Sequence, residues 1–168
     1  VSRAAAQDPG AVRLMTIHSS KGLEFPVVFL CDLSRKFNLS DSMDQLLCHK
    51  ELGLGVQIAD EKKRARYPSL GKLAIAARLR AEVVSEEMRI LYVAMTRPKD
   101  RLIMTYAAAS EDTLAGLGEE LAVRDAKAQS EEATSFGRWV LQAALNRPEA
   151  GELRNAVGTH GVSTDTQY

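Results

Sequence analysis

The sequence has few cysteines, no excess of charge of either sign and no long apolar run. Two cysteines among 168 residues cannot form a disulfide scaffold, and Cys31 and Cys48 lack the spacing of a C-x-x-C motif. Lys plus Arg total 22, as do Asp plus Glu, which excludes a polycation that holds nucleic acid by bulk charge alone. No apolar run approaches the ~18–20 residues that a membrane span needs, so no membrane partner is expected.

Other absences concern the localisation of the protein, metal binding and the two ends of the chain. The first residues lack the apolar core and cleavage site of a secretory signal, which together with the scarcity of cysteine predicts a cytoplasmic protein. Cys48 and His49 are adjacent and have no partners at zinc spacing, so no metal site is predicted. The chain starts without Met and has small or polar residues at both ends, as expected of a piece of a longer protein with a flexible lead-in at 1–11 and a frayed polar tail at 149–168.

What is present is typical of an α/β protein. Loose alternation over 12–17 predicts a strand, and the continuous apolar run at 27–31 predicts a strand covered on both faces, as in a parallel sheet. Residues 71–97 predict a long helix that Pro98 ends, followed by a strand at 101–106. This order predicts part of an α/β layer, with a mostly parallel sheet and flanking helices. The helical stripe consists of Leu73, Ala77, Val84, Met88, Leu91 and Met95.

Outside these elements the pattern is weaker. Residues 34–69 are turn-rich and predict only a short hairpin or edge strand at 52–56. An acidic linker and a short amphipathic helix are expected within 111–148, with Trp139 as a packing residue rather than a base-stacking one.

Charge is unevenly distributed although it sums to zero. Residues 61–80 are basic and residues 111–132 are acidic. The structural interpretation is that both stretches are solvated faces of the protein. The functional interpretation is that the basic stretch lies near nucleic acid or a partner.

Residues 16–25 combine hydroxyls, a histidine, a lysine and a glycine just past the first predicted strand. Ligands bind at this edge of open α/β sheets. If Ser19 or Ser20 caps a short helical turn, the free backbone N–H groups suit a phosphate, and Gly22 lets the backbone approach a ligand closely. A capped turn with a satisfied histidine explains the local pattern equally well.

Thr96 and Arg97 stand at the end of the long predicted helix. An arginine fixed there can reach a phosphate in fork geometry and stabilise charge on a transferring γ-phosphoryl group. On local pattern alone, the favoured alternative is an arginine that caps the last helical carbonyls.

Taken together, the two stretches resemble one family. The run VRLMTIHSSKGLEFPVVFL, in residues 12–34, resembles motif V of the superfamily 1A, UvrD-like DNA helicases, and SEEMRILYVAMTRPKDRL, in residues 84–106, resembles their motif VI. The stretch between the motifs is similar to the AddA group of these helicases. The resemblance implies that residues 12–110 are the later part of the second RecA-like domain (domain 2A) of a P-loop NTPase.

The resemblance also implies roles for individual residues. Arg97 corresponds to the motif VI arginine that reaches the γ-phosphate of ATP, and Glu24, with Gly22 beside it, to the motif V acid near the ribose. In the family, some motif V positions touch the DNA backbone or link DNA to the ATP site. The residues that correspond to them here are Thr16, His18 and Ser19.

Two further features qualify this resemblance. Pro98 stands where the family usually has alanine, which affects the aim of the preceding arginine. The sequence has no Walker A loop and no Walker B acid pair, so the chain is expected to be inactive alone.

The implied parent uses ATP with Mg²⁺ to move on and unwind single- and double-stranded DNA in double-strand-break repair by homologous recombination, together with a nuclease and an AddB-type partner subunit. Three alternatives stay open. They are a UvrD- or PcrA-like repair helicase without a nuclease, an inert interaction module of the same fold, and a free-standing DNA-binding domain.

Overall fold

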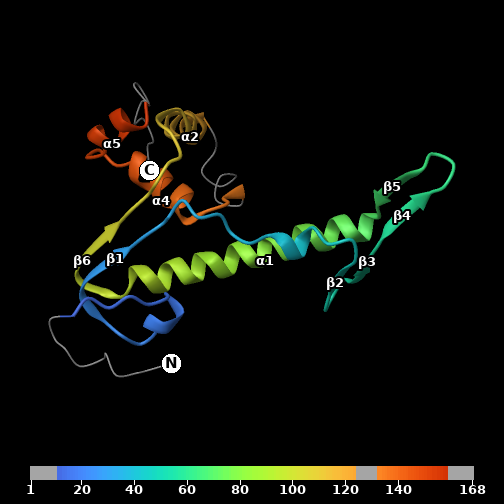
Figure 1. The fold of residues 1–168 in the computed structure, drawn as a ribbon, viewed down its shortest axis with the longest axis horizontal. Coiled ribbons are helices and arrows are strands. Elements are labelled where there is room, and N and C mark those ends of the chain that lie inside the picture. The colour runs from blue at the N-terminus through green and yellow to red at the C-terminus, as the bar shows by residue number, and fades with distance from the viewer. Residues whose placement is uncertain (1–10, 124–131, 159–168) are drawn as a thin grey trace.

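A computed structural model of the chain describes residues 11–123 and 132–158, and no side chain of 121–123. The long helix α1 (Leu70–Met95) connects two separate parts of the molecule (Figure 1). A parallel strand pair lies at its C-terminal end and two small hairpins lie at its N-terminal end. Most of the expected lead-in and the last part of the expected tail lie outside the described residues.

The parallel pair consists of β1 (Phe25–Leu30) and β6 (Pro98–Met104). Its register runs from Phe25 opposite Pro98 to Leu30 opposite Met104, with an irregularity between Phe25 and Val27. Pro26 lies at that irregularity and has no N–H to give to a ladder. The pairing confirms both predicted strands and the α/β class.

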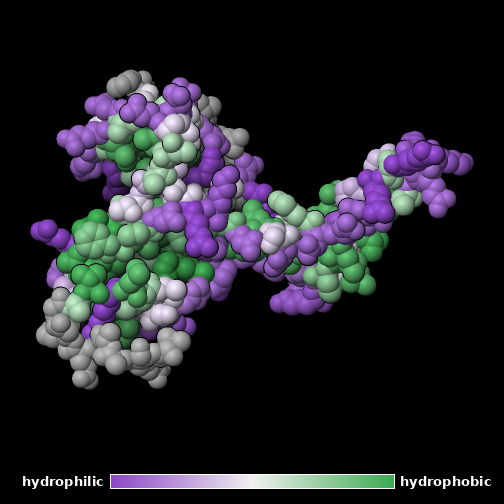
Figure 2. Space-filling model, in the orientation of Figure 1, coloured by the Kyte–Doolittle hydropathy of each residue, from purple (hydrophilic) through white to green (hydrophobic). Residues whose placement is uncertain are grey.

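Two expectations about this layer are wrong. Residues 12–17 form no strand, because nothing in the described ranges lies beside them to pair with their backbone, and Val12 and Leu14 are fully exposed. β1 is also not covered on both faces, since the Phe29 side chain is 63% exposed. Figure 2 shows apolar surface at the end of the molecule that holds β1 and β6.

The helix α1 confirms the long helix predicted from the sequence. It begins after Ser69, whose Oγ accepts the Lys72 backbone N–H at 3.1 Å, and it ends at Met95, with Thr96 as the C-cap. Pro98 then starts β6. Within the part of the chain that the structure describes, no helix is long and apolar enough to cross a membrane.

The side of α1 that packs against the molecule agrees only in part with the predicted stripe, of which Val84 and Leu91 are buried. Leu73 is 53% exposed, and Met88 and Met95 are also exposed. The side chains that α1 buries are Lys72, Ile75, Val84, Leu91 and Ala94. The stripe is displaced because the two halves of α1 pack against different elements, the hairpins at one end and the sheet with α4 at the other.

The main core lies where α1, the parallel pair and α4 (Phe136–Leu145) meet. The ring of Phe37 lies 5.1 Å from that of Trp139 and 5.4 Å from that of Phe136, the latter in an edge-on arrangement. Trp139 is 9% exposed, which confirms that it is a packing residue within the predicted amphipathic helix.

We call the hairpin region at the N-terminal end of α1 the arm (Figure 1). The elements of the arm are β2 (Leu47–His49), β3 (Gly53–Gly55), β4 (Gln57–Asp60) and β5 (Ala65–Pro68). The short turn η2 (Ser40–Ser42) precedes them and lies beside the middle of α1 (Figure 1). Residues 52–56 contain the single strand β3, which confirms the edge-strand alternative and not a hairpin within that stretch. Its antiparallel partner β2 and the second hairpin, β4–β5, were not predicted.

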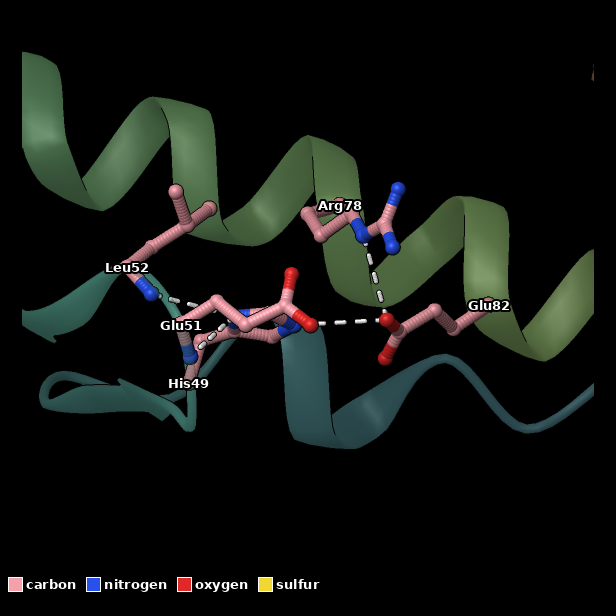
Figure 3. Close-up of polar contacts among 5 residues, drawn as sticks. All are labelled: His49, Glu51, Leu52, Arg78 and Glu82. Carbon is pink, nitrogen blue, oxygen red and sulfur yellow. Dashed lines mark hydrogen bonds and ion pairs between the residues drawn. The ribbon is translucent and has the colours of Figure 1, made fainter.

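His49 connects the first hairpin to α1 (Figure 3). Its Nδ1 accepts the backbone N–H groups of Glu51 and Leu52 at 3.2 and 3.3 Å, and its Nε2 lies 3.3 Å from Glu82 Oε1 on α1. Because Nδ1 accepts two bonds, we assign the ring proton to Nε2, which then donates to Glu82. This bond lowers the pKa of the Glu82 carboxyl, and the Arg78 guanidinium acts in the same direction.

Gly55 allows β3 to lie directly against α1. A Cβ atom at this position would lie 2.6 Å from Lys72 Cα, closer than real Cβ contacts allow. The buried ammonium of Lys72 donates to the Gln45 carbonyl at 3.1 Å, so this cation fastens the arm to the helix.

Beyond β6 the chain forms α2 (Glu111–Val123) and α5 (Gly151–Ala156). The expected fraying after Pro148 is wrong within 149–158. The Arg154 guanidinium donates to the carbonyls of Leu145 and Arg147 at 2.9 Å each, and Val157 is 1% exposed. Hydrogen bonding and burial therefore order a segment whose composition is polar.

Candidate functional site

The motif V loop, residues 16–24, begins with the 3₁₀ turn η1 (His18–Ser20). Thr16 Oγ1 accepts the backbone N–H of Ser19 at 3.2 Å and lies 2.9 Å from the Ser19 hydroxyl. The condition considered from the sequence, a cap by Ser19 or Ser20, is not met, and Thr16 provides the side-chain oxygen that accepts the Ser19 N–H. The structure thereby brings two exposed hydroxyls together next to the exposed His18.

Ile17 and Ser20 hold the loop on the side that faces the core. Ile17 packs against the main core. The Ser20 hydroxyl is buried and donates to the Ile17 carbonyl at 2.6 Å. These contacts leave Thr16, His18 and Ser19 on the outer side of the loop, available to a ligand.

Gly22 is required by the turn that follows. The Leu23 N–H donates to the Ser20 carbonyl at 2.9 Å, while Lys21 has φ −57° and ψ 125° and Gly22 has φ +81°. These values describe a type II turn, whose third position needs a positive φ. A Cβ on Gly22 would meet nothing within 4 Å, so the requirement is conformational rather than steric.

Arg97 joins the motif V loop to the end of α1. Its Nε donates to the Val93 carbonyl at 2.9 Å, Nη2 to Thr96 Oγ1 at 2.9 Å, and Nη1 to the Leu23 carbonyl at 3.0 Å. The first bond is the helix-capping role that the local pattern favours. The last spans 74 positions of sequence and ties motif VI to motif V.

The guanidinium of Arg97 still has donors to offer. Of its five N–H groups, three are bonded to described residues, so within the described part of the chain two remain for a phosphate oxygen. The side chain is partly exposed. Its chemistry and accessibility therefore fit a role beside a nucleotide phosphate.

Glu24 lies next to the same corner and faces Lys99. The Lys99 ammonium is 3.4 Å from Glu24 Oε2, and both side chains are more than half exposed. Such a pair contributes only about 0–1 kcal/mol, so either carboxylate oxygen remains accessible to a hydroxyl donor. A carboxylate here fits the ribose contact that the resemblance implies.

Glu87 lies on α1, within the run that resembles motif VI, and its carboxyl is the second group of the described residues with a shifted pKa. Burial raises the pKa of the Glu87 carboxyl, while the charges of His18 and Arg35 oppose that rise.

Two partners in this site are not predicted by the sequence. The Leu23 carbonyl that anchors Arg97 and the Lys99 ammonium that faces Glu24 carry no local signal. The parallel pairing of Phe25 with Pro98 explains both contacts, since it aligns residues 23–24 with residues 97–99. Among the described residues, no three His, Cys, Asp or Glu side chains gather to hold a metal ion.

Comparison with known proteins agrees with this arrangement. Residues 2–109 match the UvrD-like helicase C-terminal domain. The chain belongs to this family. Its parallel pair and flanking helices are consistent with part of a RecA-like domain.

Two similar proteins carry the name of an ATP-dependent helicase/nuclease subunit of the AddA type. The chain is 43% identical over 162 residues to the one from Ruminiclostridium cellulolyticum, covering 94% of this chain and 13% of that protein. It is 50% identical over 103 residues to the one from Bacillus cytotoxicus, covering 61% of this chain and 8% of that protein. The resemblance to the AddA group is thereby confirmed, and the chain spans only about a tenth of the length of these relatives.

Proposed function

We propose that this chain is the part of an AddA-type, ATP-dependent DNA helicase–nuclease subunit that forms one wall of the ATP cleft and part of the single-stranded DNA track. The observation that carries the proposal is the hydrogen bond from Arg97 Nη1 to the Leu23 carbonyl. It joins the arginine at the end of motif VI to the loop that presents Thr16, His18 and Ser19.

In this proposal Arg97 reaches the γ-phosphate with its two remaining N–H donors. A guanidinium in that position stabilises charge that develops on the transferred phosphoryl group. Glu24 accepts a hydrogen bond from the ribose, and Gly22 maintains the turn that positions Glu24. Magnesium-bound ATP supplies the free energy of hydrolysis, and its magnesium ligands belong to other parts of the parent.

The same geometry gives a route by which DNA affects the nucleotide. A DNA strand that contacts the hydroxyls of Thr16 and Ser19 would move the turn that ends at Leu23, since that turn follows them directly in the chain. A shift of the Leu23 carbonyl alters the position of Arg97, because the two are directly bonded. The motif V loop is therefore the proposed mechanical link between DNA binding and ATP turnover.

The parent's setting follows from the relatives. We infer that it unwinds DNA at double-strand breaks for recombination repair in the cytoplasm, with an AddB-type partner subunit. The similarity to proteins named helicase/nuclease supports this function over a repair helicase without a nuclease or an inert module. Residues 12–110 are the proposed helicase segment of the chain.

Three measurements test the proposal. The 168-residue chain alone should show no DNA-stimulated ATP hydrolysis, and clear activity would contradict it. In the parent, Glu24→Ala should weaken nucleotide binding, and Thr16→Val combined with Ser19→Ala should reduce the stimulation of ATP turnover by DNA. Unchanged nucleotide affinity or unchanged stimulation would remove the corresponding residue from the proposed site.

A further inference from the structure

The outer hairpin of the arm, β4–β5, carries a concentrated positive charge at its tip. Four exposed cations occur within five residues, preceded by two carboxylates, Asp60 and Glu61. Figure 2 shows the hydrophilic surface of this tip, at the far end of the molecule from the parallel pair. The four cations are Lys62, Lys63, Arg64 and Arg66.

An ordered turn holds these side chains in place. Asp60 pairs with Ala65 across the hairpin, and Asp60 Oδ1 accepts the backbone N–H groups of Lys62 and Lys63 at 3.0 and 3.1 Å. Arg64 adopts a left-handed backbone with φ 49°. The Asp60 carboxylate is therefore committed to the turn, and no ion pair to any of the four cations occurs within residues 11–123 and 132–158.

The other cations of the basic stretch are occupied. Lys72 is buried and bonded to the Gln45 carbonyl, and Arg78 pairs with Glu82. Arg80 donates to the Glu132 carbonyl. The positive charge that remains available in residues 61–80 is thus concentrated at the hairpin tip.

An apolar and aromatic surface adjoins the tip. Ile58 and Tyr67 are directly opposite one another in the hairpin register, and both side chains are about half exposed. Exposed aromatic rings beside cations are typical of surfaces that bind nucleic acid, because every base can stack on a ring.

The tip lies far from the motif V loop. α1 has 26 residues and is therefore about 39 Å long. The arm adjoins its N-terminal end and Arg97 follows its C-terminal end (Figure 1). The length of α1 alone corresponds to about 12 base pairs of B-form DNA.

We propose that the β4–β5 tip is a second nucleic-acid contact, which binds the sugar–phosphate backbone through Lys62, Lys63, Arg64 and Arg66. Four cations that form no ion pair with the described residues, on an ordered turn, match the phosphates of a DNA backbone. The Tyr67 ring lies on the opposite face of β5 from Arg66 and adds a surface on which a base can stack, which an acidic protein segment would not use. The contact does not depend on the ATP role of Arg97, so it goes beyond the proposed function.

The test measures DNA binding by the whole 168-residue chain. A fluorescent DNA duplex and a single strand, each of about 30 nucleotides, are titrated at several salt concentrations between about 50 and 200 mM. The tip variant combines Lys62→Gln, Lys63→Gln, Arg64→Gln and Arg66→Gln. The matched control also removes four exposed cations, through Lys36→Gln, Lys50→Gln, Arg101→Gln and Arg147→Gln.

The tip variant should lose at least about tenfold in affinity, with a slope of log K against log salt lower by about 3–4 for duplex and about 3 for single strand. The control should keep most of the affinity and slope. Tyr67→Ala should weaken single-strand binding more than duplex binding. The hairpin lies outside the main core, so circular dichroism and thermal unfolding of the tip variant should match those of the unaltered chain.

Three results would overturn the proposal. The first is an equal loss of DNA affinity in the tip and control variants, and the second is an unchanged DNA affinity in the tip variant. The third is no measurable DNA binding by the unaltered chain at low salt. Thr16→Val with His18→Ala, measured in parallel, separates the two sites. A loss there with none at the tip would reject the second contact and leave the proposed function intact.

Discussion

Replacing His49 should weaken the attachment of the arm to α1. His49→Ala removes the acceptor for the Glu51 and Leu52 N–H groups, and it removes a ring that is 5% exposed. Each lost backbone bond costs about 1 kcal/mol, and the emptied ring site costs a similar amount. The bond to Glu82 adds less, because that carboxylate is exposed to solvent. We expect the free energy of unfolding to fall by about 2–3 kcal/mol.

Urea unfolding combined with amide hydrogen exchange measures this effect. Exchange at Glu51 and Leu52 should accelerate, while fluorescence of Trp139, the single tryptophan, reports on the main core separately. Glu82→Gln is the matched control, since it keeps an oxygen acceptor for Nε2 and should cost much less than His49→Ala. A His49→Ala chain within about 0.5 kcal/mol of the unaltered chain, with unchanged exchange at Glu51 and Leu52, would refute the reasoning.

Other positions give equally specific expectations. Gly22→Ala should destabilise the chain by about 1 kcal/mol because φ is +81°, whereas Gly22→Asn should cost less, and equal effects in thermal unfolding would argue against the turn assignment. Trp139→Ala should cost about 3 kcal/mol or more in urea unfolding, and a loss below about 1 kcal/mol would mean that the three-ring cluster is not a core. The lowered pKa of Glu82 contributes stability that is present above the ordinary pKa of glutamate and disappears as pH falls through the lowered value. Glu82→Gln should therefore flatten the acid side of the stability–pH profile, and an unchanged profile would contradict that contribution.

Features with a strong local pattern are predicted well from this sequence. The long proline-free segment gives α1, the apolar runs give β1 and β6, and Pro98 marks the change between helix and strand. The packing of Trp139 follows from its place in an amphipathic helix. The motif V and VI residues are found because their sequences resemble those of a family.

Features that depend on neighbours distant in the sequence are not predicted from the sequence. Residues 12–17 have a strand-like pattern, but a strand also requires a partner beside it. The bond between Arg97 and the Leu23 carbonyl joins positions far apart in sequence, so only the register of the parallel pair reveals it. The helix at residues 151–156 is held against the end of α4 by Arg154, which donates to the carbonyls of Leu145 and Arg147, and composition does not indicate these contacts.

ATP turnover by the full-length parent carrying Arg97→Ala tests the central claim most directly. The account predicts a loss of roughly 10³-fold or more at saturating DNA, the scale known for arginines that stabilise a transferred phosphoryl group. Arg101→Ala, an exposed arginine on the neighbouring strand β6, should leave turnover nearly unchanged. Near-normal turnover in a folded Arg97→Ala parent would show that Arg97 only caps α1 and holds the motif V loop, and would contradict its assignment to the ATP cleft.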